Sequence, residues 1–194
     1  MRSLQVCTSI DETVAAVMSE DHARLREPSE WVVRWTHRIP RGGTVLDVAC
    51  GGGRHARMLA AQGYTIFAVD RDRDALTSLA GVPGVTTLCA DLEQGPWLYP
   101  GRSFAGIIVT NYLHRPLLPH LLDAVAAPGV LIYETLAVGN ERYGRPSNPD
   151  FLLQPGELLE WVRGRLTVVA YEHLVVSEPR PAVVQRICAA RNAS

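Results

Sequence analysis

The sequence predicts an α/β fold in which about seven strands form one open sheet, mostly parallel, with helices on both faces. Short apolar runs rich in β-branched residues alternate with helical patterns between residues 44 and 136. These runs are apolar almost throughout, which is typical of parallel strands buried on both faces. Two further β-rich runs near the C-terminal end are spaced to form an antiparallel pair.

The elements follow in order along the chain. Residues 11–38 have a helical pattern that breaks at Pro28, and Trp31 and Trp35 are spaced to share one apolar face. Each of the next five apolar runs predicts a strand, at residues 44–50, 64–70, 85–92, 104–111 and 130–136. Helices are expected between them at residues 54–62, 72–80 and 115–127.

The pattern changes after residue 136. Residues 137–154 contain two glycines and two prolines without clear periodicity, which predicts a long loop. A short helix is expected at residues 155–163, with proline in its first turn. Residues 166–177 and 182–190 are the two β-rich runs of the closing antiparallel pair.

Length and composition fit a single domain. The chain has 194 residues, of which 47% are hydrophobic and 20% charged, as in ordinary globular domains. The net charge of −1 argues against a generally basic nucleic-acid-binding protein. All 19 basic residues are arginine, which excludes Schiff-base and P-loop lysine mechanisms.

Cysteine spacing and apolar runs bear on metals and location. Cys7, Cys50, Cys89 and Cys188 are widely spaced and form no C-x-x-C pair, so we expect reduced thiols and no metal site. The N-terminal residues lack the apolar core of a secretory signal, and no apolar run approaches the roughly 18 residues of a membrane span. We therefore expect a cytoplasmic protein without membrane contact.

The strongest functional signal is the run DVACGGG at residues 47–53, between a predicted strand and a predicted helix. Glycines let the main chain approach a ligand closely, and the helix N-terminus offers unpaired N–H groups. Asp70 ends the next strand, where a carboxylate can accept hydrogen bonds from a ribose diol. The sequence thus predicts a nucleoside-containing ligand at this edge of the sheet.

Two ligand classes fit the glycine loop. Gly51, Gly53 and Ala56 satisfy the relaxed dinucleotide pattern G-x-G-x-x-G/A, which by itself is a weak signal. Asp47 argues against a pyrophosphate there because its negative charge would repel one. Asp91 closes the third strand, where it could accept a hydrogen bond from an adenine amino group. The antiparallel strand pair that is expected at the C-terminal end of the sheet also disfavours a nicotinamide cofactor.

The run VLDVACGGGRHARMLAAQGYTIFAVDRD (residues 45–72) resembles the first two motifs of the class I S-adenosylmethionine-dependent methyltransferases. The resemblance covers about residues 44–136, implies a Rossmann-like fold, and extends to the closing strand pair. A less specific similarity, carried by compact size and the run GGGRHARMLAAQGY, is to small bacterial methyltransferases of the tellurite-resistance type. The implied cofactor is S-adenosylmethionine, with S-adenosylhomocysteine as product.

By matching position, the resemblance implies that Asp47, Ala49, Gly51 and Gly53 form the loop under the methionine and ribose part of the cofactor. Ala49 is a departure, because many members of the family have glycine there. Arg54 begins the following helix, where a cation opposes the helix dipole. A nearby anion would offset this unfavourable interaction between the Arg54 charge and the helix dipole. In the family, the carboxylate of the cofactor lies not far from this position.

The remaining cofactor residues implied by the resemblance follow the next three strands. Asp70 would bind the ribose hydroxyls, with Arg71 beside it. Asp91 and Leu92 would border the adenine, and Asn111 would lie near the methionine portion and the methyl group. The single domain then divides into an N-terminal helical cap (1–40), a cofactor-binding core (44–136), a substrate-side loop and helix (137–165) and the strand pair (166–194).

Candidate catalytic residues are Asn111, Tyr112, His114 and Glu134, all near strand ends. Methyl transfer from a sulfonium mainly requires alignment, so a base is needed only where the acceptor must lose a proton. His114 is either such a base or a capping or solvent histidine. Tyr112 either lines the methyl site or packs, and Glu134 acts on the acceptor or forms a structural ion pair.

The acceptor is expected to be a small molecule, because no separate substrate domain and no basic face are evident. Arg142, Tyr143 and Arg145 in the long loop could recognise an anionic acceptor. Alternatively, this loop is solvated and its arginines pair with Glu141. The helices around Trp31 either form a lid or pack as core.

Two other functions stay open at this point. An NAD(P)-binding oxidoreductase would use the same glycine loop and Asp70. A non-catalytic module would bind S-adenosylmethionine without transferring its methyl group.

Overall fold

The computed structural model describes residues 27–178 and 180–193. The predicted helical pattern at residues 11–26 and Cys7 lie outside the described residues. Among the described residues, no helix is long and apolar enough to cross a membrane.

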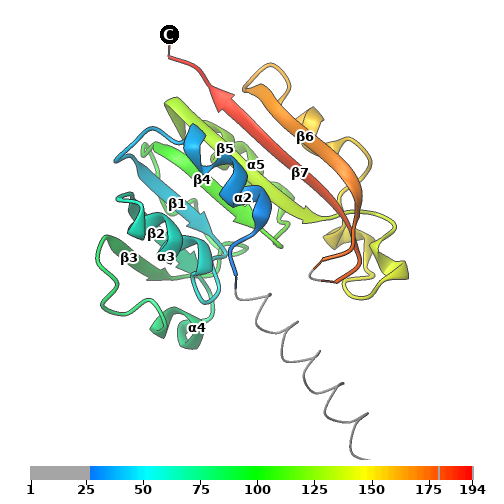
Figure 1. The fold of residues 1–194 in the computed structure, drawn as a ribbon, viewed down its shortest axis with the longest axis horizontal. Coiled ribbons are helices and arrows are strands. Elements are labelled where there is room, and N and C mark those ends of the chain that lie inside the picture. The colour runs from blue at the N-terminus through cyan, green and yellow to red at the C-terminus, as the bar shows by residue number, and fades with distance from the viewer. Residues whose placement is uncertain (1–26, 179, 194) are drawn as a thin grey trace, which may run out of the picture.

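Seven strands form one sheet in the order β3-β2-β1-β4-β5-β7-β6 (Figure 1). The first five strands are parallel to one another, and β7 runs antiparallel to both β5 and β6. This arrangement confirms the predicted fold class. The strands are β1 (Thr44–Val48), β2 (Thr65–Asp70), β3 (Val85–Cys89), β4 (Phe104–Thr110), β5 (Val125–Leu136), β6 (Thr167–Val176) and β7 (Ala182–Arg191).

Helices cover both faces of the sheet, and a separate apolar core lies under each layer (Figure 1). Helices α2, α3 and α4 pack on one face, and α5 and α6 pack on the other. In the described part of the chain, four short 3-10 helices, η1 to η4, lie in the connections. The α-helices are α2 (Glu30–Trp35), α3 (Arg54–Ala61), α4 (Arg73–Thr77), α5 (Leu118–Asp123) and α6 (Glu157–Val162), and the 3-10 helices are η1 (Thr36–Arg38), η2 (Arg115–Leu117), η3 (Asn140–Arg142) and η4 (Pro149–Phe151).

Helix α2 packs as part of the core. Ser29 caps its N-terminus by accepting a hydrogen bond from the Trp31 backbone N–H. Trp31 is buried, and its ring meets Trp35 edge to face at 5.7 Å, which confirms the predicted shared apolar face. Of the two alternatives, lid or core, helix α2 therefore corresponds to core packing.

The predicted helix at residues 115–127 is wrong at its C-terminal end. Helix α5 ends at Asp123, and β5 begins two residues later, five residues before the predicted strand. Val125 pairs with Phe104 of β4, and the register then shifts so that Gly106 pairs with Val130. The burial of Val125 and its pairing with β4 outweigh the helical propensity of the neighbouring alanines.

Candidate functional site

The loop between β1 and α3 brings the backbone to the carboxyl end of the sheet. Gly51 and Gly53 both have positive φ, at 52° and 72°. A Cβ at Gly51 would meet nothing within 4 Å, whereas a Cβ at Gly53 would lie 2.4 Å from the Leu79 methyl carbons. The space beside Gly51 is therefore open, and Gly53 permits close packing against Leu79, just after α4.

Ala49 and Asn111 adopt the same left-handed region, with φ of 51° and 54°. Asparagine tolerates this conformation better than most residues, but alanine is strained in it. Ala49, where many members of the family have glycine, thus occupies a position that favours glycine. Both residues directly follow a central strand, β1 or β4.

Asp70 holds the glycine loop through its carboxylate. Its Oδ2 accepts a hydrogen bond of 2.7 Å from the Gly51 N–H, and its Oδ1 accepts one of 2.8 Å from the Asp72 N–H. Each carboxylate oxygen has a second lone pair available for a ligand. Asp70 can therefore fix the loop and still accept hydrogen bonds from a diol.

A cavity of about 150 Å³ lies at the carboxyl ends of β1, β2 and β3. It brings together six residues predicted from the sequence and two that sequence reasoning missed, Ala90 and Glu93. Glu93 lies in the turn after β3, where its N–H donates to Asp91 Oδ1 at 2.9 Å. The lining residues are Ala49, Asp70, Arg71, Ala90, Asp91, Leu92, Glu93 and Tyr112.

Asp47 lies beneath the loop and does not line this cavity. Its side chain is buried, and its Oδ2 has no hydrogen-bond partner among the described residues. Burial raises the pKa of Asp47 to about 7, against the lowering effect of the Ala56 backbone amide and the Arg54 charge. Burial also lowers the pKa of Arg54, although Glu134 and Asp47 act to raise it. The Arg54 guanidinium donates to the Glu27 carbonyl at 3.1 Å.

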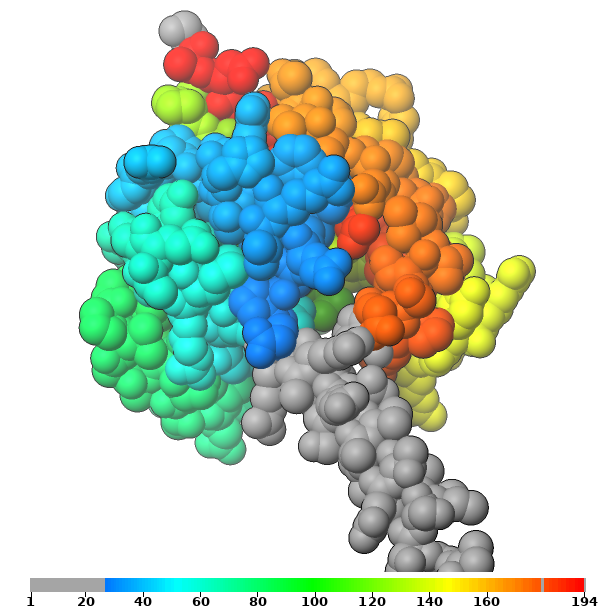
Figure 2. Space-filling model, in the orientation of Figure 1, coloured from blue at the N-terminus to red at the C-terminus, as the bar shows by residue number. Residues whose placement is uncertain are grey.

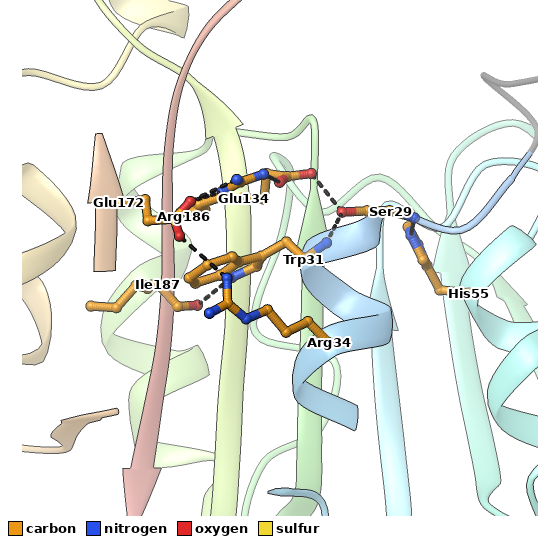
Figure 3. Close-up of polar contacts among 8 residues, drawn as sticks. All are labelled: Ser29, Trp31, Arg34, His55, Glu134, Glu172, Arg186 and Ile187. Carbon is orange, nitrogen blue, oxygen red and sulfur yellow. Dashed lines mark hydrogen bonds and ion pairs between the residues drawn. The ribbon is translucent and has the colours of Figure 1, made fainter. Parts of the chain in front are cut away.

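Glu134 on β5 has both carboxylate oxygens engaged (Figure 3). Oε1 accepts a hydrogen bond of 2.8 Å from the Ser29 hydroxyl, and Oε2 accepts one of 3.3 Å from Arg186 on β7. Arg186 also pairs with Glu172 on β6 at 2.6 Å. These contacts form the structural ion pair that is one of the two alternatives for Glu134.

His55, on the first turn of α3, is a buried residue that sequence reasoning missed. Its Nε2 accepts a hydrogen bond of 3.0 Å from the Ser29 N–H, so Ser29 lies between His55 and Glu134 (Figure 3). Burial lowers the pKa of His55 to about 3, which keeps the ring neutral. Residues 27–40 lie directly beside α3 on one face of the molecule (Figure 2).

His114 lines a second cavity, of about 170 Å³, which shares Leu92 and Glu93 with the first. Trp97 and His120 also line it, with their rings stacked at 5.7 Å and an interplanar angle of 6°. The structure therefore places His114 and Tyr112 in adjoining cavities rather than in one.

Arg115, next to His114, clamps the segment that precedes α6. Its Nε and Nη2 donate to the two carboxylate oxygens of Glu157, at 2.7 and 3.0 Å. The same guanidinium donates to the carbonyls of Asp150 and Leu152. One side chain thus attaches the long loop after β5 to the segment that follows β4.

The three candidate acceptor residues of that loop lie away from both cavities. Arg142, Tyr143 and Arg145 are exposed. Glu141, the expected partner of the arginines, instead accepts a hydrogen bond of 2.8 Å from the Gly139 N–H.

Comparison with known proteins identifies this fold. Residues 45–127 match the family described as "Methyltransferase domain". No curated protein matches the sequence.

The fold is shared with several solved structures. TehB from Haemophilus influenzae is similar with a TM-score of 0.68 and 16% identity, over 84% of this chain and 62% of TehB. A TehB-like S-adenosylmethionine-dependent methyltransferase from Corynebacterium glutamicum has a TM-score of 0.64 and 17% identity, over 95% of this chain and 100% of that one. The [4+2]-cyclase SpnF has a TM-score of 0.64 and 14% identity, over 84% of this chain and 79% of SpnF.

The present chain thus spans less than two thirds of the length of TehB. The match over residues 45–127 is to a methyltransferase rather than to a nicotinamide-dependent oxidoreductase. Residues 45–127, which include the glycine loop, Asp70 and Asp91, are thus similar to a methyltransferase domain.

Proposed function

We propose that this protein transfers a methyl group from S-adenosylmethionine to a small-molecule acceptor by in-line displacement. The observation that carries this proposal is the cavity at the carboxyl ends of β1, β2 and β3. It is lined by Ala49, Asp70, Asp91 and Leu92, which the family resemblance assigns to the cofactor. Open α/β sheets bind their ligands at this edge.

The residues of the cavity fit the hydrogen-bonding groups of the cofactor. Asp70 would accept from the ribose hydroxyls, and Asp91 would accept from the adenine amino group. The open space beside Gly51 leaves room for the ribose and methionine part. Asp47 and Arg54 would lie at the methionine end, with Gly53 keeping the loop tight against α4.

The bound cofactor supplies a methyl group on a positively charged sulfur, a very good leaving group. The chain's own residues then mainly align the acceptor and exclude water. Asn111 is exposed directly after β4. Its backbone N–H donates a hydrogen bond of 2.9 Å to the Glu134 backbone carbonyl. His114 would accept a proton only from an acceptor that must lose one.

The acceptor would bind between the segment after β4 and residues 137–165. Arg115 attaches these two segments to each other, which supports treating the long loop as the substrate side. Arg142 and Arg145, with Tyr143, give the loop two cations suited to an anionic acceptor such as a carboxylate or oxyanion. The free thiols of Cys50, Cys89 and Cys188 support a cytoplasmic location.

A product-release assay tests the proposal. The purified chain is incubated with S-adenosylmethionine and a panel of small carboxylates, oxyanions, amines and thiols, and S-adenosylhomocysteine is measured. We expect acceptor-dependent release that Asp70→Asn abolishes and Asp74→Asn, an exposed substitution on α4, preserves. Release from no acceptor in the panel would contradict the small-molecule assignment.

A second function, cofactor binding without methyl transfer, has one observation in its favour. A structure with the same fold, SpnF, is a [4+2]-cyclase, so this architecture also occurs in an enzyme named for other chemistry. This function predicts tight binding of S-adenosylhomocysteine without its release from S-adenosylmethionine in the presence of any acceptor.

A further inference from the structure

The segment of residues 27–29, which leads into α2, is attached to the first turn of α3 by two contacts. The Ser29 N–H donates to His55 Nε2 at 3.0 Å (Figure 3). The Glu27 carbonyl accepts a hydrogen bond of 3.1 Å from Arg54 Nη1. Because α3 directly follows the glycine loop, this segment lies next to the start of the candidate cofactor site.

The Ser29 hydroxyl joins the same segment to β5. It donates to Glu134 Oε1 at 2.8 Å, and Glu134 pairs in the sheet with Thr110, the last residue of β4. Strand β4 lies between β1 and β5 in the sheet. Residues 27–29 therefore bridge from α3 to β5 across the carboxyl end of β4, with Ser29 between His55 and Glu134 (Figure 3).

Serine, histidine and glutamate meet here without the geometry of a nucleophilic triad. In such a triad the serine hydroxyl donates to the imidazole. Here the hydroxyl of Ser29 donates to Glu134, and His55 Nε2 accepts from the main chain instead. The contacts of Ser29 thus fix a segment of the chain and do not activate a nucleophile.

Arg54 is the functional group that this segment holds. Its side chain is half-buried, and its charge opposes the dipole at the N-terminus of α3, so this position is unfavourable without partners. The Glu27 carbonyl is one partner, and the negative charges of Glu134 and Asp47 also stabilise the guanidinium. The contacts of Ser29, two residues after Glu27, determine where that carbonyl lies.

We propose that Ser29 is a positioning residue of the cofactor site. Its hydroxyl and N–H hold residues 27–29 between α3 and β5, and the Glu27 carbonyl in turn holds the Arg54 guanidinium at the amino-acid end of the site. Ser29 acts through Arg54 and needs no contact with the cofactor. This inference rests on the proposed function, because it takes the amino-acid part of S-adenosylmethionine to lie beside Arg54.

Calorimetric titration with two probes tests the inference. S-adenosylhomocysteine contains the amino-acid part of the cofactor, and 5′-methylthioadenosine lacks it. Ser29→Ala and Ser29→Gly both remove the hydroxyl, but glycine caps a helix almost as well as serine, so a loss of affinity common to both does not come from the cap of α2. Ser29→Thr keeps the hydroxyl. Glu172→Gln is the matched control, because it removes an ion pair of Arg186 and leaves the Ser29 contacts in place.

We expect Ser29→Ala and Ser29→Gly to bind S-adenosylhomocysteine about three- to tenfold more weakly than the wild type, as for the loss of one hydrogen bond. Their affinity for 5′-methylthioadenosine, and the affinity of Ser29→Thr and Glu172→Gln for both probes, should stay within about twofold of the wild type. In an Arg54→Ala background, Ser29→Ala should weaken S-adenosylhomocysteine binding by less than about twofold further, because Arg54 carries the effect.

Unchanged affinity of Ser29→Ala and Ser29→Gly for S-adenosylhomocysteine would overturn the inference. An equal loss for both probes would also overturn it, because the effect would then not be specific to the amino-acid end. So would a loss that persists in full without Arg54. Failure of the wild type to bind S-adenosylhomocysteine would instead overturn the proposed function, so the two failures are distinguishable.

Discussion

The two glycines of the loop predict opposite outcomes for one substitution. Gly51 and Gly53 both have positive φ, so alanine is strained at either position. At Gly51 the new methyl group would project into open space that we assign to the cofactor. At Gly53 it would collide with the buried Leu79 side chain. Gly51→Ala should therefore impair binding, and Gly53→Ala should mainly impair folding.

The expected magnitudes follow from these contacts. A left-handed alanine costs roughly 1–2 kcal/mol, and the loss of unfolded-chain entropy returns about 0.4–1 kcal/mol. Gly51→Ala should thus lower the free energy of unfolding by about 1 kcal/mol. Gly53→Ala adds an overpacking cost of about 1–3 kcal/mol, for a total of roughly 2–4 kcal/mol. Gly52, with no positive φ and a nearest contact of 3.7 Å to Ser78 Oγ, is the matched control.

Urea unfolding gives the stability of each variant, and titration with S-adenosylhomocysteine gives its affinity. We expect Gly51→Ala to remain folded and to bind at least about tenfold more weakly, while Gly52→Ala stays close to the wild type in both measurements. A folded Gly51→Ala variant with unchanged affinity would refute the assignment of the open space to the cofactor. Equal stability of Gly51→Ala and Gly53→Ala would refute the packing argument.

Three further predictions concern contacts around the site. His55 is neutral in the folded state, with its pKa lowered from 6.5 to about 3, and the unfolded chain gains a proton below pH 6.5. Stability should therefore fall as the pH drops from 6.5 towards 3. Over this pH range the urea midpoint should fall less for His55→Gln than for the wild type. An equal fall in both proteins would contradict the burial argument. Glu134 and Arg186, about 15% and 19% exposed, should show a coupling of about 1 kcal/mol in a double-mutant cycle of unfolding, and additive single effects would contradict the ion pair. Arg115→Lys should lose the bidentate contact with Glu157 and speed amide hydrogen exchange at residues 149–157, with β1 and β4 unaffected; unchanged exchange there would argue against the clamp.

The sheet and the cofactor loop were predictable from the sequence because local patterns encode them. Continuous apolar runs define the central strands, and the glycine run after β1 fixes where the backbone turns. Asp70 is the last residue of β2 and Asp91 follows β3, and parallel strands bring such residues to one edge. Six of the predicted residues accordingly line a single cavity.

The misses involve contacts between residues far apart in the sequence. Ser29 bonds to His55, 26 positions away, and to Glu134, 105 positions away, and no local periodicity encodes these contacts. The early start of β5 depends on the pairing of Val125 with β4. The ion pair between Glu134 and Arg186 likewise joins residues that are 52 positions apart.

The most direct test of the account is a calorimetric titration of the purified chain with S-adenosylhomocysteine, beside NAD⁺ and NADP⁺. The account predicts saturable binding of S-adenosylhomocysteine alone, and its loss in Asp70→Asn. Binding of a nicotinamide nucleotide in its place, or of none of the three, would contradict the assignment of the cavity to S-adenosylmethionine.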